Sequence, residues 1–272
     1  MRAPSRTLRP DPARGGPLAV LSTRALPSLV VALLVVAILP VFGIWAAPSY
    51  VIFDPEDHFA FSLSNLLPLV FSFLAALLYV PVILQETRRS GWMPIVARRG
   101  MRGYLRTHLV RSASVGAVTF GGAIAVAACL SLVILPGTGM VTYYPEDRVV
   151  PFSEQMTFTQ LAHYGTAVYV AFMVLWVAVH GALITSLCAV VALHLPNPFL
   201  ALLAVPGSLF LLDTVLALVG LEEFATDNAA LPTALAQGSA LPPVVTTVML
   251  AGLLVAVEGR ALRAPVPPAA MR

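Results

Sequence analysis

The sequence predicts an all-α integral membrane protein with six transmembrane helices and both ends of the chain in the cytoplasm. Hydrophobic residues make up 58% of the 272 residues and charged residues only 11%, with a mean hydropathy of +0.88. A soluble domain needs a more polar composition to cover its surface. Apolar runs recur at roughly the 20-residue length that a helix needs to cross about 30 Å of hydrocarbon. Almost all of the arginines fall before the first run, between the second and third runs, or after the last run.

The apolar runs define six candidate spans and the organisation of the chain. The spans are 26–47, 65–84, 113–135, 165–192, 198–219 and 242–258. The segments between them are too short for an independent soluble domain. We therefore expect a basic N-terminal segment over 1–25, a six-helix transmembrane domain over 26–258 with a long loop at 85–112, and a C-terminal tail over 259–272.

The distribution of charge predicts which side of the membrane each loop faces. Short cytoplasmic loops retain positive charge. With six spans, one side receives fifteen of the sixteen arginines, and the other receives only Arg148. The other side also takes nine of the thirteen acidic residues, which are Asp54, Glu56, Asp57, Glu146, Asp147, Glu154, Glu222, Glu223 and Asp227. We expect a multi-pass protein of the cytoplasmic (plasma) membrane, and the arginine-rich, lysine-free composition favours a bacterial source.

Three local patterns show what kind of helices the spans form. The first apolar run, at about 20 residues, exceeds the 7 to 15 of a signal peptide, and Trp45 interrupts an A-x-A site ending at Ala47, so we expect an uncleaved helix. Cys129 and Cys188 both fall within spans, which predicts no disulfide and no metal site. A stripe of small residues at i+4 spacing predicts close packing against another helix; it comprises Ala117, Gly121, Ala125 and Cys129.

The loop 85–112 holds seven arginines and a helical pattern of two arcs. The apolar arc holds Met101, Tyr104, Leu105 and His108, and the basic arc holds Arg98, Arg102 and Arg106. This spacing predicts an amphipathic helix, broken near Gly100 or Gly103. Clustered arginine is typical of nucleic-acid-binding surfaces, but the flanking spans place this cluster at a membrane, and we expect no nucleic acid partner. The helix either lies on the anionic inner leaflet or docks a cytoplasmic protein.

The same loop resembles a segment of a known family. Glu86, Arg88, Ser90 and Gly91 form E-x-R-x-S-G, and Arg98 and then Tyr104-Leu105 follow. This order resembles the membrane subunits of type-2 ATP-binding-cassette exporters, the ABC-2 permeases, whose six-helix layout with cytoplasmic ends is also similar. In that family the segment after the second span is a coupling helix seated in a groove of the ATPase. The resemblance implies that the ATPase contacts are Glu86, Arg88, Gly91, Trp92, Arg98, Arg102, Tyr104 and Leu105.

The resemblance also implies where ATP is hydrolysed. The chain contains no lysine, and a P-loop needs one to reach the phosphates of ATP. ATP and Mg²⁺ are therefore expected on a separate nucleotide-binding ATPase subunit, with a second permease copy or a related permease completing the assembly in the lipid bilayer. The expected function is ATP-driven export of an unidentified substrate by a transporter subunit that is not itself an enzyme and holds no cofactor.

Two ionisable residues inside spans are candidates for a transport path. Asp213 and His180 lie in apolar helices, where ionisable side chains are costly and often functional. Each also has a structural interpretation: Asp213 lies about two helical turns from the outer end and suits a hydrogen-bonded carboxylate, and His180 suits a hydrogen bond to a neighbouring helix. The segment 221–243 suits a short re-entrant or interfacial helix.

Two other functions compete with export. One is a polytopic membrane enzyme, but the chain contains neither G-x-S nor H-E-x-x-H, and Asp227 rather than arginine follows the pair Glu222-Glu223. The other is a non-transporting membrane anchor or immunity-type protein that uses the loop only to recruit a cytoplasmic partner. Such an anchor would leave the ATP turnover of its partner unchanged.

Overall fold

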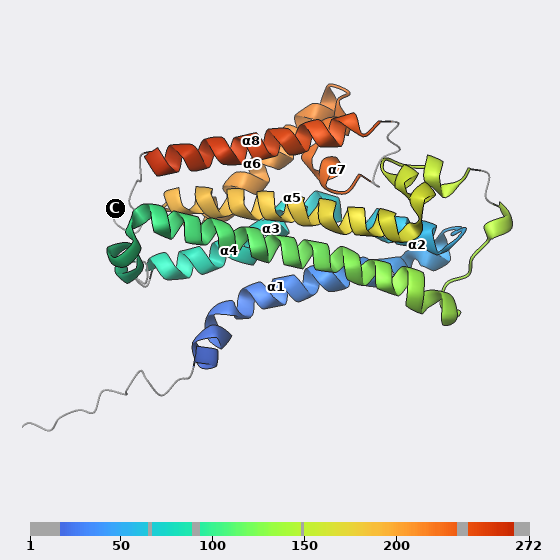
Figure 1. Ribbon diagram of the computed structural model, residues 1–272, viewed down its shortest axis with the longest axis horizontal. Helices are drawn as coiled ribbons and strands as arrows, with labels where there is room; N and C mark the ends of the chain where they lie inside the picture. The colour runs from blue at the N-terminus through green and yellow to red at the C-terminus, as the bar shows by residue number, and fades with distance from the viewer. Residues whose placement is uncertain (1–16, 65–66, 89–92, 148–149, 233–238, 264–272) are drawn as a thin grey trace, which may run out of the picture.

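Six long helices form the body of the protein. The computed structural model describes residues 17–64, 67–88, 93–147, 150–232 and 239–263 (Figure 1). The long helices are α1 (Pro17–Ala46), α3 (Leu67–Arg88), α4 (Met93–Cys129), α5 (Thr166–His194), α6 (Pro198–Leu218) and α8 (Leu241–Arg263). All six contain stretches long and apolar enough to cross a membrane, which confirms the predicted number of spans. Within the described ranges there is no β-strand, only a single bridge between Ile52 and Tyr143.

Short elements gather toward one end of the bundle (Figure 1). They are α2 (Pro55–Leu63), α7 (Thr226–Ala230), a π-helical turn at Leu130–Ile134, and 3-10 turns at Ala47–Ser49, Leu135–Gly137, Pro145–Asp147, Phe152–Glu154, Thr159–Tyr164 and Glu222–Phe224. We call this end the acidic end. At the opposite, basic end, α1 begins, α3 approaches α4, α5 approaches α6, and α8 ends (Figure 1).

Helix α5 is the element around which the others pack. It contacts α3, α4, α6 and α8, and buried residues follow its whole length, from Tyr169 near its start to Leu193 near its end. A helix that buries several faces against neighbours has no need of a polar stripe, which accounts for its uniformly apolar sequence.

The backbones of α4 and α5 touch at a pair of glycines. A Cβ atom built on Gly181 would lie 2.6 Å from the carbonyl oxygen of Gly116, and one built on Gly116 would lie 2.6 Å from Oγ1 of Thr185 and against the carbonyl of Gly181. Small residues allow this approach, as in many membrane helix pairs. The predicted stripe is correct at Gly121, whose Cβ would lie 2.9 Å from that of Ala178. It is wrong at Ala125 and Cys129, which are exposed.

Helix α4 begins much earlier than the predicted third span. The chain is non-helical at Gly100, with φ 70° and ψ 167°, which confirms the predicted break there. From residue 101 to Cys129 the helix runs about 43 Å at 1.5 Å per residue, longer than the roughly 30 Å of hydrocarbon. The reason for the extension is that Tyr104, Leu105 and His108 are buried while arginines occupy the opposite face. A hydropathy window averages these two faces, and the predicted span therefore begins too late.

The contact between α4 and α5 predicts a position-specific effect of adding one methyl group. We expect Gly116→Ala to lower the free energy of unfolding by about 1–3 kcal/mol, because the new Cβ overlaps the backbone of α5. Gly122→Ala is the matched control, since nothing lies within 4 Å of its Cβ position. It should be neutral or stabilising because alanine favours helix more than glycine does. Thermal unfolding of both variants in detergent measures the difference, and equal effects would contradict the close approach.

Candidate functional site

Exposed arginines form a basic surface where α3 approaches α4. The side chains concerned are Arg98, Arg99, Arg102, Arg106 and Arg111, and we call them the basic surface. The first two precede the break at Gly100, and the others follow it on the long part of α4. Arginine carries its charge at every physiological pH, so this surface attracts acidic groups on a protein or a lipid.

The predicted contact residues divide into exposed and buried groups. Arg98 and Arg102 are exposed, as the basic arc predicts, whereas Tyr104 and Leu105 are only 0% and 5% exposed. Glu86 lies near the end of α3 with 18% of its side chain exposed. Gly91 and Trp92 lie outside the described residues, as does the side chain of Arg88. The apolar arc therefore faces the interior of the bundle and not its surface.

The buried arc fastens the basic surface to three other helices. Tyr104 and Leu105 pack in one cluster, the anchor cluster, with residues of α3, α5 and α8; these are Tyr79, Ile83, Ala189, Val190, Leu193 and Ala261. Because these side chains belong to different spans, the base of the basic surface cannot shift without disturbing their packing.

A buried polar chain crosses the anchor cluster from α3 to α4. His108 is 2% exposed, its Nε2 lies 3.2 Å from Oε2 of Glu86, and its Nδ1 lies 3.0 Å from the hydroxyl of Tyr79. An Nε2–H group points toward the Glu86 carboxylate, and Nδ1 lies within hydrogen-bond distance of the Tyr79 hydroxyl. The ring of Tyr104 packs edge-on against His108, with centroids 4.4 Å apart. One histidine thus joins both helices through polar and aromatic contacts.

The polar chain predicts strong coupling between Glu86 and His108. Glu86→Ala leaves a buried imidazole nitrogen without its partner, and we expect a loss of about 1–3 kcal/mol in the free energy of unfolding. Glu86→Gln keeps an oxygen that accepts a hydrogen bond and should lose less. Once His108→Ala is present, Glu86→Ala should cost little more. Thermal unfolding of the four-member mutant cycle measures the coupling, and additive losses would show that the two side chains act independently.

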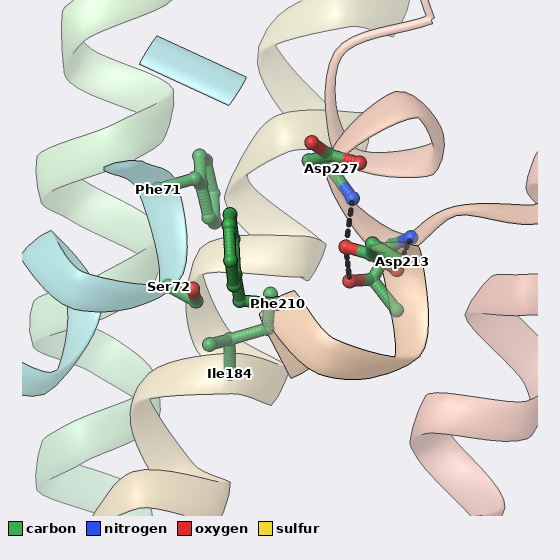
Figure 2. A pocket seen from close by; sticks show the side chains of 7 residues that line it. Phe71, Ser72, Ile184, Phe210, Asp213 and Asp227 are labelled. Atoms are coloured by element: carbon green, nitrogen blue, oxygen red, sulfur yellow. Dashed lines mark hydrogen bonds between the residues drawn. The ribbon is translucent and has the colours of Figure 1, made fainter. Parts of the chain in front are cut away.

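Asp213 fastens a short helix at the acidic end (Figure 2). Its carboxylate accepts hydrogen bonds from the backbone N–H of Thr226 at 2.7 Å, the hydroxyl of Thr226 at 2.6 Å and the N–H of Asp227 at 3.4 Å. These donors lie at the start of α7, which confirms a short helix within 221–243; residues 233–238 lie outside the described ranges. A carboxylate with several donors is satisfied without a ligand.

The cavity beside Asp213 is too small for a transported molecule. Figure 2 shows Asp213 and Asp227 on one side of it, opposite Phe71, Ser72, Ile184 and Phe210. Its volume is about 10 Å³, which is room for at most one water. The geometry therefore supports the structural interpretation of Asp213.

His180 links α5 to α8 inside the bundle. It is 0% exposed. Its Nδ1 lies 3.0 Å from the carbonyl oxygen of Trp176, to which it donates, and its Nε2 lies 3.1 Å from Oγ1 of Thr247 on α8. Trp176 in turn donates from Nε1 to the carbonyl of Ala229 at 2.8 Å. These bonds favour the structural interpretation of His180 as a link to a neighbouring helix.

The pair of carboxyls at the acidic end makes stability depend on pH. Burial, and then the nearby charge of Asp213, raise the pKa of Asp227 above its ordinary value of about 4. The folded chain therefore keeps a proton on Asp227 at pH values where the unfolded chain has lost it. The stability contributed by this group is present below the ordinary pKa and falls as pH rises through the raised pKa.

Replacing Asp227 should remove this dependence. We expect Asp227→Asn to unfold at a higher temperature than the wild type at pH 7.5 and to lose this advantage at about pH 4, where the wild-type carboxyl is protonated. Glu223→Gln in the same segment is the control because Glu223 is exposed. A gain for Asp227→Asn of the same size at both pH values, or an equal pH-dependent gain for the control, would contradict the assignment.

Neither a metal site nor a known relative identifies a function for this chain. Across the part of the chain that the structure describes, no group of three or more histidine, cysteine, aspartate or glutamate side chains is placed to bind a metal ion. Comparisons with protein-family models, with curated proteins and with solved structures find no match.

Proposed function

We propose that this chain is the transmembrane permease subunit of an ATP-driven exporter of the ABC-2 type, with ATP hydrolysed on a separate subunit. The observation that carries the proposal is the basic surface. Arg102, Arg106 and Arg111 stand on a helix continuous with the third span, and the anchor cluster joins that helix to α3, α5 and α8. A patch that only marks topology needs no such attachment. The described parts of the segment that resembles a coupling helix, residues 86–88 and 93–105, lie at this position.

The proposal assigns different roles to the two groups of contact residues. Arg98 and Arg102 are exposed and would meet acidic side chains in a groove of the ATPase, since opposite charges steer and orient such contacts. Tyr104 and Leu105 are buried and would hold the segment in place. The non-helical backbone at Gly100 lets the first part of α4, Met93 to Arg99, turn away from the rest of the helix toward the partner.

Coupling in this scheme is mechanical. Closure of the ATPase moves the short helix, and the anchor cluster passes that movement to the spans as a rigid-body shift. The buried chain of Tyr79, His108 and Glu86 makes α3 follow α4. A second permease copy or a related permease, embedded in the same bilayer, completes a path between the two sets of spans. The positive charge of the basic end supports a cytoplasmic position for it.

Charge reversal tests the proposed contact. The tagged chain is purified in mild detergent from its native host, and ATP turnover of the co-purified material is measured. We expect the wild-type chain to co-purify with a nucleotide-binding subunit. With Arg98→Glu/Arg102→Glu, we expect a roughly tenfold loss in the amount of that subunit retained or in its stimulated ATP turnover. A tenfold loss corresponds to about 1.4 kcal/mol of contact energy. The matched control is Arg260→Glu/Arg263→Glu, which reverses two exposed arginines at the end of α8 and should have little effect.

The outcomes separate export from its rivals. A wild-type chain that brings down no ATPase overturns the proposal and leaves the basic surface as a contact for anionic lipid. An ATPase that is retained but turns over equally with and without the permease indicates a non-transporting anchor. Equal losses in both reversed variants would show that general positive charge, and not this segment, binds the partner.

A further inference from the structure

Two pockets at the acidic end share one tyrosine in their linings. Tyr50 lines both a pocket of about 240 Å³, which it shares with Tyr144, and a pocket of about 350 Å³, which it shares with Phe42 and Trp45. We call the two together the aromatic hollow. Trp45 is 77% exposed and Tyr50 59% exposed, so their rings are accessible to a ligand. The volumes exceed that of the cavity beside Asp213 by more than tenfold.

The floor of the hollow is held by packing and hydrogen bonds. The N–H of Tyr144 donates to the carbonyl of Ile52 at 2.9 Å, and the N–H of Tyr50 donates to that of Ala47 at 3.1 Å. Beneath them a small buried cluster joins the end of α1 to the end of the third span; it comprises Ala47, Ile52, Leu135 and Val141. Such anchoring means that the hollow exists before a ligand arrives, as small-molecule sites usually do.

Neighbouring rings hold Tyr50 in place. The ring of Phe61 on α2 lies 4.8 Å from Tyr50 and 5.8 Å from Phe42, measured between centroids. Contacts of this kind stabilise a fixed ring orientation. The aromatic walls therefore come from α1, from the turn that follows it and from the loop near Tyr144, and α2 supports them from behind.

The charge around the hollow favours a cation. Asp54, Glu56 and Asp57 follow Tyr50 within seven residues, and the exposed Glu146 follows Tyr144. Asp54 lies close enough to Tyr143 that its charge, after burial, raises the pKa of that phenol. Arg148, the one arginine that the sequence predicts for this end, lies outside the described residues. A negative potential of this kind concentrates cations and repels anions.

The lining decides which cation fits. Aromatic faces attract ammonium groups, and quaternary ammonium most typically, through the ring quadrupole. A bare metal ion needs several oxygen ligands, and among the described side chains no carboxylate lines either pocket. We propose that the aromatic hollow binds an alkylated ammonium group, carried by a free organic cation or by a lipid headgroup. The site does not depend on the export function proposed above.

Choline and its neutral isostere test the role of the positive charge. The full chain is placed in phosphatidylglycerol nanodiscs and titrated with choline or with 3,3-dimethylbutan-1-ol, which has the same shape without the charge, and binding is measured by calorimetry. We expect choline to bind at least about fivefold more tightly than the alcohol, the ratio that a cation–π contact of about 1 kcal/mol produces. Equal affinities, or no binding of choline, would overturn the proposal.

Tyrosine variants test the position of the site. Tyr50→Leu should weaken choline binding about fivefold or more, whereas Tyr50→Phe keeps the ring and should retain the affinity. Retention by Tyr50→Phe also shows that the pocket still folds. Tyr164→Leu is the matched control, since Tyr164 is 77% exposed at the same end and lines neither pocket. An equal loss with Tyr164→Leu would show that tyrosines here act only as an interfacial belt.

Lipid composition then identifies the source of the ammonium group. In nanodiscs containing phosphatidylcholine, a hollow that binds lipid headgroups is already occupied, and added choline should bind more weakly than in phosphatidylglycerol discs. Unchanged affinity supports a free organic cation as the ligand. Either result, combined with the preference for choline over its neutral isostere, supports the site.

Discussion

The contact between the backbones of α4 and α5 at Gly116 and Gly181 determines how the rest of the bundle is arranged. Because the two helices touch there, side chains above and below can meet across the interface. Four residues toward the basic end, Ser112 donates to Ser186 at 3.3 Å, and on the other side of the contact Phe120 packs over Gly181. A larger residue at either glycine would separate the helices and withdraw α4 from the anchor cluster. The basic surface depends on this approach although it lies well away from it.

Ionisable residues within the bundle serve mainly as fasteners between elements. Asp213 holds the start of α7, His180 connects α5 to α8, and His108 connects α4 to α3. In hydrocarbon there is little water to satisfy such groups, so each needs a partner within the protein. This need gives an apolar bundle specificity, because apolar side chains alone would tolerate several rotations of one helix against another.

The sequence predicts the spans well because hydropathy and length are local properties. It also predicts the break at Gly100 and the two arcs of the helix beyond it, since both follow from residue type and spacing. The pairing of His108 with Glu86 and Tyr79 involves two helices, and no spacing within one helix reveals it. A partial signal exists, because Tyr79 and Glu86 are seven residues apart and share a helix face.

Other features of the protein depend on which helices pack together, and a single sequence does not show that. Asp213 and His180 each had two interpretations, because the choice depends on partners at Thr226 and Thr247 that are distant in sequence. The predicted stripe of small residues leaves the interface with α5 at Ala125. The rows of residues at i+3 and i+4 spacing differ by only a small rotation about the helix axis, so spacing alone does not show which row faces the neighbouring helix. The aromatic hollow arises where the end of α1, the turn that follows it and the loop near Tyr144 meet, and neither periodicity nor composition places such segments together.

The continuity of α4 has a consequence for communication across the membrane. Beyond Cys129 the helix passes through the π-helical turn at Leu130–Ile134 to Leu135, which packs in the buried cluster with Ala47 and Val141, two residues of the pocket lining. Beyond the break at Gly100, one rod therefore joins Arg102, Arg106 and Arg111 at the basic end to the cluster beneath the aromatic hollow at the acidic end. A stiff rod transmits rotation along its length, so an occupant at either end that prefers one orientation of α4 alters the other end. Thermodynamic linkage makes that influence reciprocal.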